Sequence, residues 1–195
     1  MLFILRSTGF VFISFLFSVN VFSQRTDYIV TFKKDTVYGV LKYTFGYPTS
    51  LMSDSGRYSV DVNNVDAYYE SDKNHLYKNK ALPEKTRHIF FRCLEIGRIS
   101  LYANITTLVT TSAQNPGMIT GNTKSIQLFA EKEEGKLVEV KSSGMLSGNK
   151  KHRKDFLDLI SDNKALVDIY NQNKDFELPY IQYYIHEYNK QAVNQ

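Results

Sequence analysis

The stretch Tyr28–Tyr43, YIVTFKKDTVYGVLKY, consists of two arms of alternating residues on either side of Lys34 and Asp35. β-branched and aromatic residues fill both arms, and the Asp35 side chain can bond the nearby backbone in a tight turn. This pattern is typical of an antiparallel β-hairpin. It predicts that the folded part of the chain begins as a β-rich structure.

Two further hairpins are predicted downstream. One joins residues 88–95 to residues 99–103 through Gly97, and the other joins residues 125–130 to residues 137–140 through Gly135. Two shorter strands are expected around residues 57–62 and 65–69. Loops are expected where turn-forming residues gather, at residues 46–56 and in the Thr- and Asn-rich stretch 110–123.

From Asn149 onward the apolar residues recur with a helical period. Three apolar stripes are predicted, consisting of Phe156, Leu159 and Ile160, then Leu166, Ile169 and Tyr170, and finally Ile181, Tyr184, Ile185 and Tyr188. Strands followed by helices indicate an α+β protein. We therefore expect an antiparallel β-rich sheet or roll over residues 27–141, packed by C-terminal helices over residues 150–191.

The N-terminus resembles a cleavable signal peptide over residues 1–23. Arg6 supplies the positive charge, residues 10–19 form the apolar segment, and cleavage is expected between Ser23 and Gln24. The alternative is an uncleaved membrane anchor. A membrane-spanning helix needs about 20 apolar residues, and the apolar segment 10–19 is shorter than that. The expected product is one exported α+β domain, residues 24–195, with a β-rich part at 24–145 and a helical part at 149–195. It is expected in the periplasm or associated with the outer membrane, with no transmembrane span after cleavage.

Composition excludes several classes of protein. The 195 residues are 43% hydrophobic, with 14 Tyr and 13 Phe, which is too apolar for a disordered chain. A net charge of +4 is too small to indicate a nucleic-acid partner. The single cysteine, Cys93, allows no internal disulfide, and its apolar neighbours predict a buried, unreactive thiol. The tyrosines are expected mainly in the core and at its rim, the alternative being an aromatic platform for sugars.

No catalytic, cofactor or metal motif is present in the sequence. His75, His88, His152 and His186 lack metal-ligand spacing, and there is no glycine-rich phosphate loop. Paired carboxylates of a glycoside hydrolase would leave no trace in sequence spacing, because their separation is spatial. The sequence therefore favours a protein that is not an enzyme and needs no cofactor.

The most unusual local feature is a basic cluster, which we define as Lys150, Lys151, Arg153 and Lys154. Positive charge at a helix N-terminus opposes the helix dipole. One interpretation is contact with an anionic partner, such as lipid headgroups. The other is a solvated linker before a helix that starts nearer Asp155.

Three segments resemble a group of exported, uncharacterised Bacteroidetes proteins. The first hairpin, which includes Gly39, is similar to the group's "gyIvt..gDTi.G.I" pattern. Residues 97–102, GRISLY, are similar to its "G.isLY" pattern, and Tyr188-Asn189 to its late "YN" pair. The resemblance implies a periplasmic or cell-envelope domain, which in longer relatives sometimes precedes an outer-membrane barrel, and it implies no known activity. The group often carries two Cys that could form a disulfide, and Asn163 and Gln191 stand at the comparable positions here.

These motifs also predict local structure. Gly39 within a strand predicts a bulge or a close approach of another backbone. Leu101 and Tyr102 are expected on opposite faces of their strand, one facing inward and one at the rim.

For function, the sequence favours a non-enzymatic periplasmic or cell-envelope domain that acts through contacts with another envelope protein or an anionic envelope surface. The alternatives are an exported hydrolase of envelope or dietary polymers and a small-ligand-binding periplasmic protein. The sequence leaves the oligomeric state open.

Overall fold

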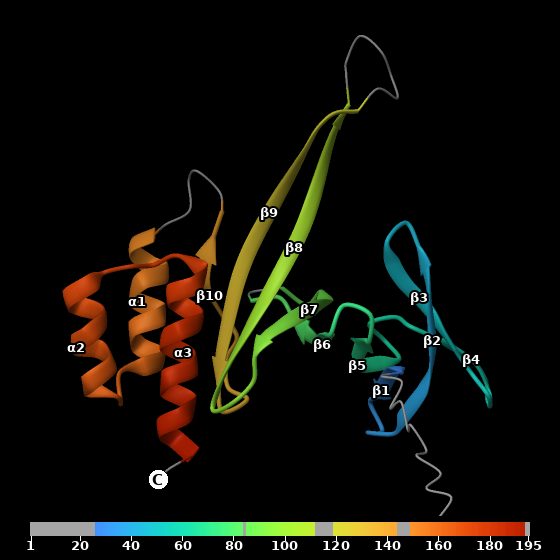
Figure 1. Cartoon of the computed structure of the whole chain (residues 1–195), viewed down its shortest axis with the longest axis horizontal. Coiled ribbons are helices and arrows are strands. Elements are labelled where there is room, and N and C mark those ends of the chain that lie inside the picture. Colours follow the sequence, from blue (N-terminus) through green and yellow to red (C-terminus); the bar gives the residue numbers. More distant parts are fainter. Residues whose placement is uncertain (1–25, 84, 112–118, 144–148, 194–195) are drawn as a thin grey trace, which may run out of the picture.

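The computed structural model describes residues 26–83, 85–111, 119–143 and 149–193. The expected leader and its cleavage site at Ser23 and Gln24 lie outside these residues. Within them, strands precede helices (Figure 1), in the order β1 (Asp27–Thr31), β2 (Thr36–Thr44), β3 (Tyr47–Ser53), β4 (Gly56–Ser59), β5 (Val65–Glu70), β6 (His75–Ala81), β7 (His88–Glu95), β8 (Ile99–Thr111), β9 (Ile119–Lys132), β10 (Val138–Ser142), α1 (Asn149–Ile160), α2 (Lys164–Asn173) and α3 (Leu178–Val193).

All ten of these strands form one open antiparallel sheet with the order β10-β9-β8-β7-β6-β5-β1-β2-β3-β4. Each of the three predicted hairpins is present, with the expected pairings β1–β2, β7–β8 and β9–β10. The helices pack at one end of the sheet, where α1 contacts β10 and β9, and α3 contacts β8 and β7. The expectation of an α+β fold, with a sheet packed by C-terminal helices, is confirmed.

The main core lies between the helices and one face of β8, β9 and β10. The apolar stripe predicted for the last helix is buried there, since its four members are at most 3% exposed. Phe156, Ile160, Leu166 and Tyr170 join it from α1 and α2. Ile169 does not, because it is 39% exposed and its place on α2 faces away from this core.

A second core lies on the opposite face of β7, β8 and β9. Phe91, Tyr102 and Phe129 pack there with Leu137. Leu101 faces the helical core instead, so the predicted opposite orientations of Leu101 and Tyr102 are correct. The prediction that one of them lies at the rim was wrong, because both are fully buried.

Two strands were missed from the sequence. β3 begins at Tyr47, inside the expected loop, because a two-residue turn at Phe45 and Gly46 is enough to reverse the chain. Pro48 is tolerated in this strand because it lies next to a register shift. β6 carries few apolar residues, yet it pairs with β5 and β7. The expected loop 110–123 is also shorter, since β8 reaches Thr111 and β9 starts at Ile119.

The structure explains Gly39 as a close backbone approach. A Cβ atom at this position would lie 2.2 Å from the carbonyl oxygen of Met52 on the neighbouring strand β3. Only a residue without a side chain fits here unless the two strands move apart.

We therefore expect Gly39→Ala to lower the free energy of unfolding by about 1–3 kcal/mol, because the clash is with rigid backbone. Denaturant unfolding followed by circular dichroism measures this. Gly121→Ala in β9 is the matched control, because a Cβ there meets nothing within 4 Å and should cost no stability. Equal stability of the two variants would contradict the close approach.

Among the described residues, no helix has the length and apolar character needed to cross a membrane.

Candidate functional site

The basic cluster predicted at Lys150, Lys151, Arg153 and Lys154 lies within α1, which begins at Asn149. The alternative of a linker before a helix starting near Asp155 is therefore wrong. Lys150, Lys151 and Lys154 are exposed, and Lys151 pairs with Asp155 at 2.8 Å. A contact between these lysines and an anionic partner stays a prediction.

Arg153 differs from its three neighbours, because it is partly buried and contacts α2 and the residues that follow it. Its guanidinium donates hydrogen bonds to the hydroxyl of Tyr170 at 3.1 Å and to the carbonyl of Lys174 at 2.8 Å. It also lies over the ring of Phe176, 4.8 Å from the ring centroid. Arg153 thus joins α1 to the end of α2. The exposed positive charges of the basic cluster are those of its three lysines.

The described parts of the chain contain Cys93, which is partly buried and not fully buried as predicted, and the four histidines of the sequence. Burial raises the pKa of the Cys93 thiol to about 11, so it is protonated at neutral pH. No group of three or more His, Cys, Asp or Glu side chains in these parts could hold a metal ion. His186 is exposed and pairs with Glu95 on β7 at 2.9 Å.

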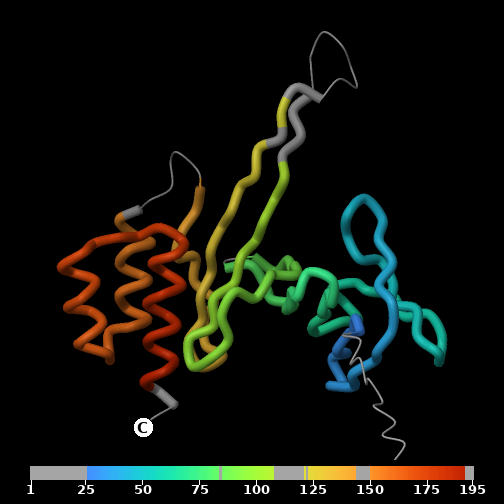
Figure 2. Tube along the Cα trace, viewed as in Figure 1, coloured from blue at the N-terminus to red at the C-terminus, as the bar shows by residue number. Residues whose placement is uncertain are grey.

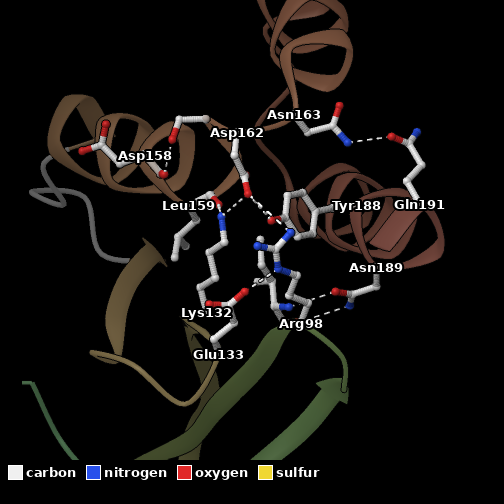
Figure 3. A network of polar contacts seen from close by, with 12 residues as sticks. Arg98, Lys132, Glu133, Asp158, Leu159, Asp162, Asn163, Tyr188, Asn189 and Gln191 are labelled. Carbon is white, nitrogen blue, oxygen red and sulfur yellow. Dashed lines mark hydrogen bonds and ion pairs between the residues drawn. The ribbon is translucent and has the colours of Figure 1, made fainter. Parts of the chain in front are cut away.

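A polar network connects the turn between β7 and β8 with the helices (Figure 3). The carboxylate of Asp162, at the junction of α1 and α2, accepts from Lys132 at 2.7 Å and from the Tyr188 hydroxyl at 2.8 Å, and Arg98 lies 3.5 Å away. Burial alone would raise the pKa of Asp162, but the bonds from Lys132 and Tyr188 outweigh it and lower the pKa. Asp162 is therefore held ionised as a structural anion.

Asn189 of α3 completes this network. Its carboxamide accepts from the backbone N–H of Ile99 at 2.9 Å and donates to the Ile99 carbonyl at 2.8 Å. Gly97 makes room for it, because a Cβ at residue 97 would lie 2.4 Å from the Asn189 side chain. The segments GRISLY and Tyr188-Asn189, which carry the resemblance described above, thus lie against each other. Asn163 and Gln191 are also in contact, with a hydrogen bond of 2.6 Å between their amides.

An open depression of about 370 Å³ lies beside this network, between the β7–β8 turn and α3. Its lining includes Arg98, His186 and Lys190, with Glu95 as its one carboxylate. A glycoside hydrolase needs two carboxylates facing each other, and Glu95 is already paired with His186. This region joins the helices to the sheet, and the lining of its depression holds one carboxylate and not a pair.

Exposed aromatic side chains lie outside the cores at the end of the β2–β3 hairpin. We call this segment the aromatic tip and define it as Tyr43–Tyr47. β1 pairs with β2 only as far as Gly39, and β4 pairs with β3 only from Ser50, so the tip extends beyond both neighbouring strands (Figure 1). Phe45 is 98% exposed, Tyr47 is 70% exposed and Tyr43 is 44% exposed. The tip therefore presents three aromatic side chains to solvent.

The backbone of the tip is unusual as well. Phe45 and Gly46 both have positive φ, 50° and 83°, which is the combination of a type I′ turn. The first position of such a turn favours Asn, Asp or Gly, and a bulky residue there is strained. The Phe45 side chain is 98% exposed, so it buries almost no apolar surface that would offset this strain, and such outliers cluster at functional sites.

Glu70 of β5 supports the base of the tip. Its buried carboxylate accepts from the Tyr43 hydroxyl at 3.0 Å and from the Tyr77 hydroxyl at 3.3 Å. Lys73 pairs with the same carboxylate at 3.1 Å and lies over the Tyr43 ring. Burial, together with the Glu70 charge, raises the pKa of Tyr77 to about 12 and also raises the pKa of Tyr43, so both tyrosines stay neutral donors. These bonds fix Tyr43 while Phe45 and Tyr47 stay exposed.

Comparison with known proteins identifies no relative. No protein-family model, curated protein or solved structure matches the chain. The candidate site therefore rests on the geometry of the chain itself.

The sequence did not single out the aromatic tip, because Gly46 and Pro48 indicated a loop and the tyrosines were expected in the core or at its rim. Of the twelve large apolar residues that are exposed in the described chain, seven lie between Phe32 and Met52. The sequence did contain one indication of the aromatic tip. Residues 43–53 include three aromatic residues and no charged residue, in a chain that is 23% charged.

Proposed function

We propose that this protein is a non-enzymatic, exported domain of the periplasm or cell envelope that acts by contact with another envelope component through the aromatic tip. The main support for this proposal is that Phe45 is almost fully exposed in a strained turn, with Tyr43 and Tyr47 on either side of it. Contiguous exposed apolar side chains on a folded protein mark interaction sites. Export itself is proposed from the signal-like residues 1–23.

Two observations support this proposal over the hydrolase alternative. Among the described carboxylates, Asp27 and Asp162 have shifted pKa values, and both are lowered. A general acid needs a raised pKa, so neither is suited to protonate a leaving group at neutral pH. The depression beside α3 has a single carboxylate in its lining, which also weakens this alternative.

The small-ligand alternative would use that same depression. Arg98 there is already bonded to Glu133 and close to Asp162, and Asn189 is bonded to Ile99. These polar groups are thus engaged within the protein, whereas the Phe45 side chain is 98% exposed.

The proposal is tested by placing a photo-cross-linking phenylalanine analogue at residue 45 in the native host and fractionating the cells. We expect adducts with an envelope component, either protein or lipid. The matched control is the same analogue at Tyr183 on α3, which is 52% exposed but lies outside the tip and should give no adduct. Absence of adducts at residue 45, or recovery of the protein in the cytoplasm, would contradict the proposal.

Phe45→Asn separates binding from folding. Asn is well suited to a positive φ, so we expect this variant to be more stable by about 1 kcal/mol. It should nevertheless lose its association with the envelope component. A variant that gains stability and keeps its association would show that the tip is not the contact.

A further inference from the structure

We propose that the aromatic tip contacts a lipid surface and inserts into the boundary between the headgroups and acyl chains. This inference rests on the proposed function and names the partner. Four features of the described chain favour lipid over a protein surface.

The first is that apolar side chains surround the tip. Tyr43 pairs with Pro48, and Thr44 pairs with Tyr47, so Tyr43 and Tyr47 lie on opposite faces of the hairpin with Phe45 at its end. A flat protein partner would cover only one of these faces. A lipid interface surrounds an inserted tip and accommodates all three rings.

The second feature is the identity and charge of these residues. Residues 43–53 contain no charged side chain, so insertion by the tip would bury no charge. Tyrosine, with an apolar ring and a polar hydroxyl, is enriched at membrane–water interfaces. Interfacial amphipathic helices bury their apolar face by about 5–10 Å, and we expect a similar depth for the aromatic tip.

The third feature is the position of the nearest lysines. Lys42 is exposed at the base of the hairpin, and Lys73 lies over the Tyr43 ring with about half of its side chain exposed. Lysines beside an inserted apolar segment can extend toward the headgroups. Since the exposed Asp72 lies next to Lys73, the local charge is nearly balanced, and we expect zwitterionic lipid to be sufficient.

The fourth feature is the β8–β9 hairpin. β7 pairs with β8 only as far as Ala103, and β10 pairs with β9 only from Gln127, so residues 104–111 and 119–126 form a two-stranded ribbon. It projects to the same side of the molecule as the aromatic tip (Figure 2). Residues 104–111 and 119–123 of this ribbon contain no charged residue. The described part of the ribbon and the aromatic tip thus present uncharged residues on the same side of the molecule, which favours contact of that side with lipid.

The absence of tryptophan from the chain provides a site-specific test. Phe45→Trp creates a single fluorescent reporter in the protein purified after export, to which vesicles of phosphatidylcholine are added, with or without phosphatidylglycerol. We expect the emission to shift to shorter wavelength with both kinds of vesicle. Tyr183→Trp is the matched reporter on α3 and should not shift.

Vesicle flotation of the same protein gives the affinity. We expect Phe45→Asn to lower the partition coefficient about tenfold, the loss expected for one large buried apolar side chain. No shift in the emission of the Phe45→Trp variant, or equal shifts in both reporter variants, would overturn the lipid contact. If the Phe45→Trp variant does not respond but photo-cross-linking at residue 45 captures an envelope protein, the proposed function stands and the lipid inference is wrong. If neither experiment succeeds, both are wrong.

Discussion

Lys80→Met should lower the free energy of unfolding by about 3 kcal/mol, because it leaves a buried carboxylate without its counter-charge. The Lys80 ammonium lies 2.7 Å from the Glu131 carboxylate, whose side chain is only 6% exposed. The Tyr102 hydroxyl donates to the same carboxylate oxygen at 2.6 Å. Without the lysine, a buried carboxylate would keep one neutral donor and lose its counter-charge. Urea unfolding at neutral pH measures the loss.

The exposed pair Lys34–Asp66 is the matched control for this prediction. Its nitrogen and oxygen atoms are 2.6 Å apart, nearly the same distance, but 73% of the Lys34 side chain is exposed. Because water screens an exposed pair, Lys34→Met should change stability little. The double variant Lys80→Met/Glu131→Gln should recover much of the loss, because it removes the unpaired charge. Similar losses for Lys80→Met and Lys34→Met would show that burial of Glu131 is not the cause.

Local patterns in the sequence predicted the hairpins and the helical stripes because one face of each element is buried. Ile181, Tyr184, Ile185 and Tyr188 recur with the helical period, and that period places them against the sheet. Gly39 was likewise readable as a close approach of two backbones. The overall α+β arrangement follows from these local signals.

Strand β6 could not be read in the same way, because its stability depends on distant polar partners. Asn79 is buried, and its amide donates to the carbonyls of Val62 and Val65. Lys80 reaches Glu131, which is far along the chain. A sequence pattern contains residue types and spacing but not these partners, so the strand resembles a polar loop.

The aromatic tip was missed for a related reason. Aromatic residues in strands usually indicate a core, and Tyr68 in β5 is indeed buried. Phe45 and Tyr47 are exposed because the β2–β3 hairpin extends past β1 and β4, and strand length relative to neighbouring strands is a tertiary property. The basic cluster shows the converse, since Arg153 looked available for a partner and is held by Tyr170 and Lys174.

Asn189→Ala should lower the free energy of unfolding by about 2–4 kcal/mol, because it leaves two buried backbone groups without partners. β7 ends at Glu95, which pairs with Leu101, so no β7 residue bonds to the fully buried Ile99. The Asn189 carboxamide binds both the N–H and the carbonyl of Ile99, and thus takes the place of a strand residue. Gln191→Ala, on the same helix, removes only an exposed amide contact and should cost less than about 0.5 kcal/mol.

A double-mutant cycle with Gly97 tests whether the two residues form one unit. In the native protein, Gly97→Ala should be destabilising, because its Cβ would lie 2.4 Å from the Asn189 side chain. In the Asn189→Ala background that side chain is absent, so the same change should cost much less. Equal costs in both backgrounds would mean that Gly97 is required by its own turn. A coupling would show that the two segments GRISLY and Tyr188-Asn189 act together to hold α3 against the sheet.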